Sequence, residues 1–383
     1  MSAHTTDAGR LDVPAGLSGV VVADTTVGDL QPERGYYTYR NHSALELARR
    51  SSFEAAWHLL SVGHLPTESE LDAFRSAVRP LRRVPPGLME SAGAAGVTPR
   101  DALLQLASGL AGVSVVDGIP ALYDHPDRRL RDALRLCSVA PTLVASAERA
   151  RLGQAPVLPS TELDHAANYL FMLRGAEPTE REAAALTNYL VSTMDHGFNA
   201  STFATRVVAS TGASITAALM AGLGALSGPL HGGAPSRVLD ALDEIGTEAR
   251  IPSWVESRLS AGERIMGFGH AVYRGPDPRA DLLREVAVAM GGDRVALAVA
   301  FEQEVVHQLE RAKPGRRLAA NVELYAAVVM EQCGIPRHLF TATFAIARMV
   351  GWAAHALEQA EQRKIIRPSA RYVGGAMVPL PES

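Results

Sequence analysis

The sequence predicts a mainly α-helical protein with one short β element near its N-terminus. Runs typical of strands are nearly absent after residue 41, whereas Ser and Thr residues that can cap helices recur before apolar, helix-periodic stretches. Hydrophobic residues make up 47% of the 383 residues, which is enough to bury a large core. A chain of this length is expected to form two domains.

The β element is expected between residues 20 and 40. Val20 to Thr26 is rich in β-branched residues, and Tyr36 to Arg40 has the composition of a short partner strand. Asp29 to Arg34 would connect the two. Met1 to Gly16 has no apolar signal core, and we interpret it as a short disordered lead-in.

Helices are expected to follow in close succession. Ser52 and Thr67 are N-cap candidates with glutamates in the turns that they open, and Thr179 with Glu182 has the spacing of a capping box. Pro141 should interrupt or kink its helix, because proline removes a backbone donor. The predicted helices are Ser43–Arg50, Phe53–Val62, Thr67–Val78, Thr98–Gly109, Arg128–Gly153, Leu163–Arg174, Thr179–Met194, Ala200–Ser210, Ser236–Gly246, Trp254–Gly262, Pro278–Met290, Ala296–Arg311, Ala326–Cys333 and Thr341–Gln359.

The stretch from Val207 to Leu230 is the longest without a charged residue. It is rich in Ala, Gly, Ser and Thr and poor in large apolar residues, so it favours a buried core helix over a membrane span. It leads into the octet GPLHGGAP at 228–235. Pro229 there should end the helix, and the glycines allow a ligand to approach the backbone closely. His231 would therefore lie at the open end of a buried helix.

Two other stretches place chemically active side chains at segment edges. His270 follows a pair of glycines, and Glu323 begins an apolar helical segment. Together with His231 they form a set of two histidines and one carboxylate, which indicates acid–base chemistry. For His231 taken alone, a helix end that happens to carry a histidine remains the alternative.

Composition narrows the class of function. The formal net charge is −4 and 20% of the residues are charged, so no overall basic field favours nucleic acid. Cys137 and Cys333 are too few for a disulfide framework and lack metal-site spacing. We expect a cytoplasmic enzyme without a metal, and with neither nucleic acid nor a membrane as partner.

Six motifs, in this order and spacing, resemble the citrate synthase family from about Leu17 to Gly374. They are DHGFNASTFATRVVASTG at 195–212, GPLHGGAP at 228–235, GFGHAVYRGPDPRA at 267–280, NVELYAAVV at 321–329, FAIARMVGWAAH ending at His355, and IIRPSARYVG at 365–374. The resemblance implies a citrate-synthase-like homodimer. Its large helical domain would comprise residues 1–231 and 336–383, and a smaller inserted helical domain, residues 232–335, would close over the substrates.

The resemblance also implies an acyltransferase of the tricarboxylic acid cycle, which condenses acetyl-CoA with oxaloacetate and hydrolyses the thioester to citrate and free CoA. Acetyl-CoA is then a substrate, and no cofactor is needed. By motif, His231 would hydrogen-bond the acetyl carbonyl, His270 would polarise or protonate the oxaloacetate carbonyl, and Glu323 would remove a methyl proton.

Substrate-binding residues also carry over by motif. Oxaloacetate is a dianion, which suits planar, permanently charged arginines better than lysines. The residues implied to hold it are His196, Arg279, Arg348 and the partner subunit's Arg367. Those implied to contact CoA are Arg264, Gly267, Phe268, Gly269 and Arg274.

Several alternatives stay open. His196 could instead cap a helix in the turn 195–199. Glu323 stands where aspartate is the commonest residue in the family, and Asn41 stands where glycine is usual. Beside a citrate synthase, the sequence allows a 2-methylcitrate synthase that uses propionyl-CoA, and a weakly active paralogue that binds CoA or oxaloacetate. It also allows a metal-dependent hydrolase built on the histidines, although metal-ligand spacing is lacking.

Overall fold

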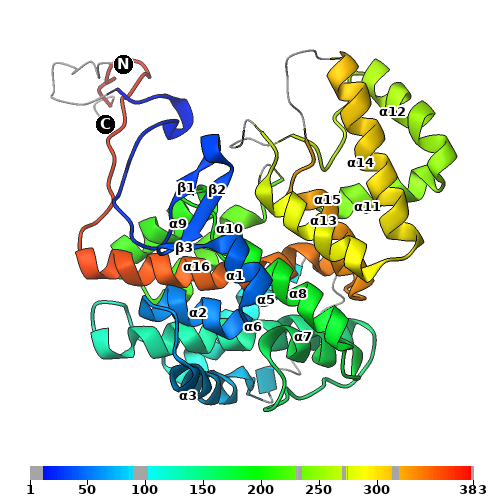
Figure 1. Cartoon of the computed structure of the whole chain (residues 1–383). Helices are drawn as coiled ribbons and strands as arrows, with labels where there is room; N and C mark the ends of the chain where they lie inside the picture. Colours follow the sequence, from blue (N-terminus) through cyan, green and yellow to red (C-terminus); the bar gives the residue numbers. More distant parts are fainter. Residues whose placement is uncertain are drawn as a thin grey trace.

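The computed structural model describes residues 12–85, 87–88, 102–229, 231, 235–269, 273, 275–312 and 319–380. Across these ranges the chain is mainly helical, and its one sheet lies near the N-terminus, which confirms the predicted fold class. Helix α16 (Phe340–Gln362) runs through the larger group of helices in Figure 1. The C-terminal arm lies beside the N-terminal segment, and the two are joined by an ion pair between Arg371 and Asp12.

The sheet has three short antiparallel strands in the order β1 (Leu30–Gln31), β2 (Tyr36–Tyr39) and β3 (His42–Ser43). Leu30 pairs with Tyr37, and Thr38 pairs with Ser43. The predicted strand at 36–40 is confirmed, but its predicted partner at 20–26 is wrong. Most of that stretch is exposed, with Val21 84% accessible, because the strands on either side of β2 come from residues 30–31 and 42–43.

The helices that follow begin where their caps predict. Ser43, Ser52 and Thr67 each accept a hydrogen bond from a backbone N–H of the first turn, and Thr67 forms a full capping box with Glu70. The α-helices of the larger group are α1 (Ala44–Arg50), α2 (Phe53–Val62), α3 (Glu68–Val78), α5 (Ala102–Asp117), α6 (Arg129–Arg151), α7 (His165–Arg174), α8 (Glu180–Thr193), α9 (Ala200–Ser210), α10 (Ile215–Leu226) and α16. The short 3₁₀ turns are η1 (Ala15–Leu17), η2 (Pro32–Arg34), η3 (Pro80–Arg82), η5 (Pro126–Arg128), η6 (Glu248–Arg250) and η7 (Arg337–Leu339).

Pro141 lies inside α6, which continues from Arg129 to Arg151, so the long helix is confirmed and the proline does not interrupt it; a kink there stays a prediction. The prediction for the charge-free run is wrong. The charge-free run 207–230 is not one helix, because it contains the end of α9 and all of α10. Gly212 separates the two helices with a left-handed φ of 78°, and Ser214 caps the second by accepting from the N–H of Ala217. The buried character of α10 is confirmed.

A second group of helices continues from the His231 loop: α11 (Pro235–Ile245), α12 (Ile251–Ser260), α13 (Pro278–Met290), α14 (Asp293–Ala312) and α15 (Val322–Gln332). They pack against one another, and α13 and α15 also contact α8 of the larger group (Figure 1). Helix α15 starts four residues before the predicted Ala326, because Asn321 caps it. The division into two domains at 231 and 335 stays a prediction. No helix of the described ranges has the length and hydropathy needed to cross a bilayer.

Candidate active site

Glu323 lies in the first turn of α15, where two polar contacts hold the backbone. Oδ1 of Asn321 accepts from the N–H of Glu323 at 3.0 Å, and Oδ2 of Asp277 accepts from the N–H of Val322 at 3.0 Å. The side chain is partly buried, and burial raises its pKa above the ordinary range. Asp277 raises it further, against the opposing charge of Arg279. A carboxyl group of this kind is a better base at neutral pH than an exposed one.

The glycine segment 267–269 runs antiparallel to the residues that lead into α15. The N–H of Gly269 donates to the carbonyl of Ala319 at 2.9 Å, and the N–H of Asn321 donates to the carbonyl of Gly267 at 2.8 Å. Gly267 and Gly269 have φ of 87° and 80°, which side chains rarely adopt. His270 and Arg274 lie outside the described residues. Gly269 itself is held at the N-terminus of α15, because Nδ2 of Asn321 donates to its carbonyl at 2.9 Å.

Arg279 is buried and tied to a carboxylate of its own helix. Its Nε and Nη2 donate to Oδ1 and Oδ2 of Asp277 at 3.0 and 2.8 Å. Burial disfavours the charged form, but Asp277 outweighs burial and raises the pKa of Arg279 above its usual value. Asp277 also caps α13 by accepting from the N–H of Arg279, so one carboxylate joins the N-termini of α13 and α15.

His196 lies in the turn between α8 and α9. Its Nε2 is 2.8 Å from the hydroxyl of Tyr273, and its ring makes an edge contact with Tyr37 of β2 at 5.2 Å. The alternative in which His196 caps a helix is wrong, because Asn199 is the N-cap of α9 and accepts from the N–H of Thr202. His196 is instead a buried ring, only 8% exposed, that presents its polar edge to a tyrosine.

His231 contacts α9 at Ser201, with 2.9 Å between Nε2 and Oγ. Burial lowers the pKa of His231, and the charge of Arg348 lowers it further, so the ring is neutral near pH 7. Ser201 also donates to Oδ1 of Asn199 at 2.7 Å. When it does so, its hydroxyl proton points toward Asn199 and not toward His231. The neighbours Leu230 and 232–234 lie outside the described residues.

Arg348 of α16 is 2% exposed, and its Nε donates to the carbonyl of Thr193 at 2.9 Å. Its guanidinium lies 4.6 Å from the ring centroid of Phe344. Burial lowers its pKa, opposed by the carboxylate of Asp195. Neither Nη atom donates to any residue in the described part of the chain, so this buried cation retains donors for an anion.

The other predicted contacts lie apart from this cluster. Arg264 and Arg367 are exposed, and neither forms an ion pair with the residues that the structure describes. The N–H of Ile366 donates to Oγ of Ser210 at 3.0 Å, after which the chain continues as an exposed arm. The structure thus brings together His196, His231, Arg279, Glu323 and Arg348, whereas Arg264 and Arg367 are exposed and form no ion pair in the described ranges. Phe268 is partly buried and packs edge-on against Phe301 of the second helix group, and its predicted contact with CoA stays a prediction.

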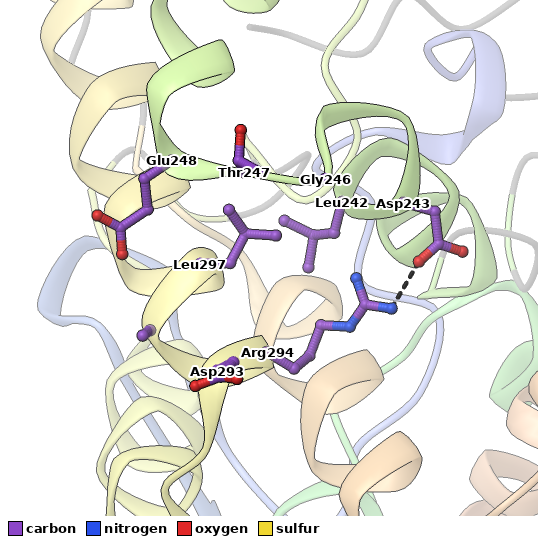
Figure 2. Close-up of a pocket in the computed structure, with 9 residues that line it drawn as sticks. Leu242, Asp243, Gly246, Thr247, Glu248, Asp293, Arg294 and Leu297 are labelled. Carbon is purple, nitrogen blue, oxygen red and sulfur yellow. Dashed lines mark hydrogen bonds and ion pairs between the residues drawn. The ribbon is translucent and has the colours of Figure 1, made fainter.

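A cavity of about 610 Å³ lies elsewhere in the second helix group, between α11, η6 and α14. Figure 2 shows Arg294 extending across it to Asp243, at 2.5 Å, with Glu248 and Thr247 on the opposite wall. None of the predicted site residues lines it. We therefore assign the chemistry to the buried cluster rather than to this cavity. Within the described ranges, no three His, Cys, Asp or Glu side chains are placed to share a metal ion.

Sequence reasoning left several residues of the cluster unassigned. Tyr273 and Asp277 lie inside the motif at 267–280, and Ser201 lies inside the motif at 195–212, so their positions were marked but their roles were not. Asp195 is the first residue of the motif at 195–212, and His355 is the last residue of the motif FAIARMVGWAAH, so these two positions were also marked without a role. In chemical terms, the cluster combines a neutral histidine, a carboxylate with a raised pKa and a buried arginine with spare donors. Such a set can remove a proton, stabilise a developing oxyanion and bind a carboxylate.

Comparisons with known proteins agree with this chemistry. The family model described as "Citrate synthase, C-terminal domain" matches residues 16–369. The chain is 37% identical to a citrate synthase of Haloferax volcanii, over 95% of this chain and 96% of the relative, and 34% identical to a 2-methylcitrate synthase of Mycobacterium tuberculosis, over 100% and 95%. Among solved structures, the ternary complex of the Thermoplasma acidophilum citrate synthase with carboxymethyl coenzyme A and oxaloacetate is 26% identical and superposes with a TM-score of 0.86, covering 97% of this chain and 98% of that one.

Proposed function

Because the chain belongs to the citrate synthase family, we propose that this enzyme condenses acetyl-CoA with oxaloacetate to give citrate and free CoA. The observation that carries the proposal is the arrangement of Arg348 and His231. A buried guanidinium with spare Nη donors exerts its charge on a neutral histidine held by Ser201. A carboxylate bound at Arg348 would therefore lie close to a donor suited to a thioester oxygen.

In the first step, Glu323 removes a methyl proton of the thioester. Such a proton is too weakly acidic for a carboxylate in water, so the developing enolate oxygen needs a preorganised hydrogen bond, worth about 2.7–4 kcal/mol. His231 supplies that bond from Nδ1 if its Nε2 accepts from Ser201. The Ser201 hydroxyl proton must then turn from Asn199 to His231, which the 2.9 Å separation allows.

In the second step, the enolate attacks the oxaloacetate carbonyl, whose oxygen takes up a proton to give the citryl thioester; water then hydrolyses the thioester to citrate and free CoA. Arg348 offers its Nη donors to a carboxylate, and His196, oriented by Tyr273, binds the same substrate. Arg279 is paired with Asp277 and lies near Glu323, whose pKa its charge lowers. Arg279 also helps to hold the N-termini of α13 and α15 together and attracts the oxaloacetate dianion. His270 polarises the carbonyl in the family's mechanism and keeps that role in our proposal. Contacts of Arg264, Arg274 and the segment 267–269 with CoA also remain part of it.

We further propose that the active unit is a homodimer in which the partner subunit's Arg367 completes the oxaloacetate site. Support comes from the arm that follows Ile366, where Tyr372, Met377 and Leu380 are 82%, 93% and 89% exposed. Apolar side chains of this kind are usually covered in an assembly. Mixing inactive Arg367→Leu and His231→Ala subunits should restore part of the activity in heterodimers. No recovery after verified subunit exchange would contradict the shared site.

The reaction needs no cofactor, since acetyl-CoA is a substrate. Both cysteines, Cys137 and Cys333, are buried free thiols, which suits a reducing compartment. We therefore place the enzyme in the cytoplasm, with its condensation serving the tricarboxylic acid cycle.

The test is release of free CoA with oxaloacetate and a panel of acyl-CoA thioesters. We expect acetyl-CoA to give the highest kcat/KM, with propionyl-CoA lower by about ten- to hundredfold, because one methylene in an apolar pocket changes binding by about 1–3 kcal/mol. The 34% identity to a 2-methylcitrate synthase supports a second candidate, which a preference for propionyl-CoA would establish instead. No release from any thioester would favour the paralogue that binds without turnover.

A further inference from the structure

A buried chain of polar side chains approaches the oxaloacetate-binding residues from within the protein. Arg206 of α9, His355 of α16 and Asp195, the residue before His196, are 0%, 1% and 2% exposed. Nη1 of Arg206 lies 3.1 Å from Nδ1 of His355, and Nε2 of His355 lies 3.3 Å from Oδ1 of Asp195. None of the three has a part in the proton transfers proposed above.

These contacts determine which nitrogen of His355 carries the proton. An arginine guanidinium stays protonated and only donates, so Nδ1 of His355 must be the acceptor. The proton of the neutral ring is then on Nε2, which faces Asp195. In the described ranges, Nε2 of His355 and Oδ1 of Asp195 have no hydrogen-bond partner, and they face each other at an ion-pair distance of 3.3 Å. Removing the imidazole would leave this buried oxygen without a nearby donor.

The far end of the chain is held by packing and by charge. Nη1 of Arg206 donates to Oε2 of Glu358 at 2.5 Å, and Nε donates to Oε1 of Gln359 at 3.0 Å. The guanidinium also lies 5.3 Å from the ring centroid of Phe198. These contacts direct Arg206 toward His355, so the orientation of the imidazole is set before any substrate binds.

The near end of the chain joins the residues proposed to bind oxaloacetate. Oδ2 of Asp195 accepts from the N–H of Gly197 at 3.2 Å and so closes the turn that carries His196. Burial raises the pKa of Asp195, but His355, Arg348 and the Gly197 N–H together hold it below the usual range, so the group is an anion at neutral pH. It is also the largest opposing charge acting on buried Arg348.

Helix α16 is shaped for this contact. Arg348, Gly351 and His355 are three and then four residues apart, which places them on one face of the helix. A Cβ on Gly351 would lie 2.3 Å from the carbonyl oxygen of Met194 and 3.0 Å from Cβ of Asp195. Only glycine therefore lets the helix backbone approach the turn closely enough for His355 to reach Asp195.

We propose that His355 is a positioning residue for oxaloacetate binding. In the tautomer imposed by Arg206, it orients the carboxylate of Asp195, which closes the turn bearing His196 and opposes the charge of Arg348. The inference rests on the proposed function, in which Arg348 and His196 bind oxaloacetate. His355 itself touches neither substrate.

The test compares two substitutions that differ in one donor. His355→Leu removes both ring contacts, whereas His355→Gln retains an amide N–H close to the position of Nε2. We expect His355→Leu to raise the KM for oxaloacetate, and its calorimetric Kd, about tenfold or more, because it leaves a buried carboxylate oxygen with no facing donor. The KM for acetyl-CoA should change less than about twofold, and His355→Gln should stay within about threefold of wild type for oxaloacetate.

A matched control is available at His338, whose Nε2 lies 2.7 Å from Oε2 of Glu148 in the larger helix group. His338→Leu should lower thermal stability without changing the oxaloacetate KM. If His355→Leu does not fold, His355→Asn replaces it, because the shorter amide cannot reach Asp195 and should show the same tenfold loss.

Two outcomes would overturn the positioning role: an oxaloacetate KM that stays at the wild-type value while stability falls, or an equal loss for both substrates. A wild-type protein that releases no CoA and binds no oxaloacetate would overturn the proposed function instead. An active wild type combined with an unaltered His355→Leu variant would remove the positioning role alone.

Discussion

Shortening the proposed base by one carbon tests the site most directly. Glu323→Asp keeps the carboxylate and its intrinsic acidity, and it changes only the reach of the side chain. The backbone cannot follow the shorter side chain, because Asn321 holds the N–H of residue 323 at 3.0 Å and Asp277 holds the N–H of Val322 at 3.0 Å. The carboxylate should therefore retract by about one bond length, roughly 1.5 Å.

A displacement of about 1 Å at a reacting group can cost about 10² in rate. Some of this loss can be recovered by rotation about the remaining side-chain bonds, so we expect Glu323→Asp to lower kcat about ten- to hundredfold. Glu323→Gln keeps the length but removes the base, and it should lower kcat by about 10²–10⁴. Oxaloacetate binding should be nearly unchanged in Glu323→Asp, which keeps the charge and the described contacts of Arg348, and should not weaken in Glu323→Gln, which removes a negative charge near the dianion.

The assay is CoA release at saturating oxaloacetate and acetyl-CoA, with oxaloacetate Kd measured separately by calorimetry. Glu331→Asp is a matched control on the same helix, since that carboxylate pairs with Arg294 and Arg337 away from the site. Its kcat should remain at the wild-type value. If Glu323→Asp raised kcat, the backbone would not be adjusted to glutamate, and the site would be a weakened version of an aspartate site.

Three further predictions follow from the same geometry. As the pH falls, kcat/KM should drop at a pH above the ordinary glutamate pKa, because the base acts only when ionised and burial raises the pKa of Glu323. This drop should be absent in Glu323→Gln, and a drop at the usual carboxyl pKa would contradict the assignment. His231→Ala should lower kcat at least about 10²-fold while the protein stays folded by circular dichroism, and near-normal turnover would remove His231 from the mechanism. Arg348→Lys should keep the buried charge yet raise the oxaloacetate KM about tenfold or more, since lysine lacks the planar fork; equal losses for both substrates would point to misfolding.

Features of the fold that depend on near neighbours in the chain were predictable. Ser52 and Thr67 cap helices through hydrogen bonds that reach only three residues ahead, so their effect is readable in the sequence. The charge-free run around Gly212 was misjudged because composition does not show where a backbone turns left-handed. The segment 20–26 was misjudged because a strand needs a partner, and tertiary packing gave β2 its partners elsewhere.

The pairing of charges in the candidate site could not be predicted from the sequence either, because it depends on residues that are far apart in the chain. Motif spacing identified His196, His231, Glu323 and both buried arginines, but it treated the two arginines as equivalent. The structure shows that the two arginines differ. Nε and Nη2 of Arg279 already donate to Asp277, whereas neither Nη atom of Arg348 donates to a described residue. Which carboxylate acts on which arginine depends on the packing of α13 against α15 and of α16 against α8, and no local pattern encodes it.

The charges of the described site explain why a second subunit is required in our proposal. Asp277 balances Arg279 and Asp195 opposes the charge of Arg348, so the ionised carboxylate of Glu323 leaves the described part of the site with an excess negative charge. A dianionic substrate would be repelled by that charge and would raise the pKa of Glu323 further. Binding therefore needs added positive charge that this cluster does not contain. The partner subunit's Arg367 would supply it at the exposed arm, which is why dimer assembly and oxaloacetate affinity should depend on one another.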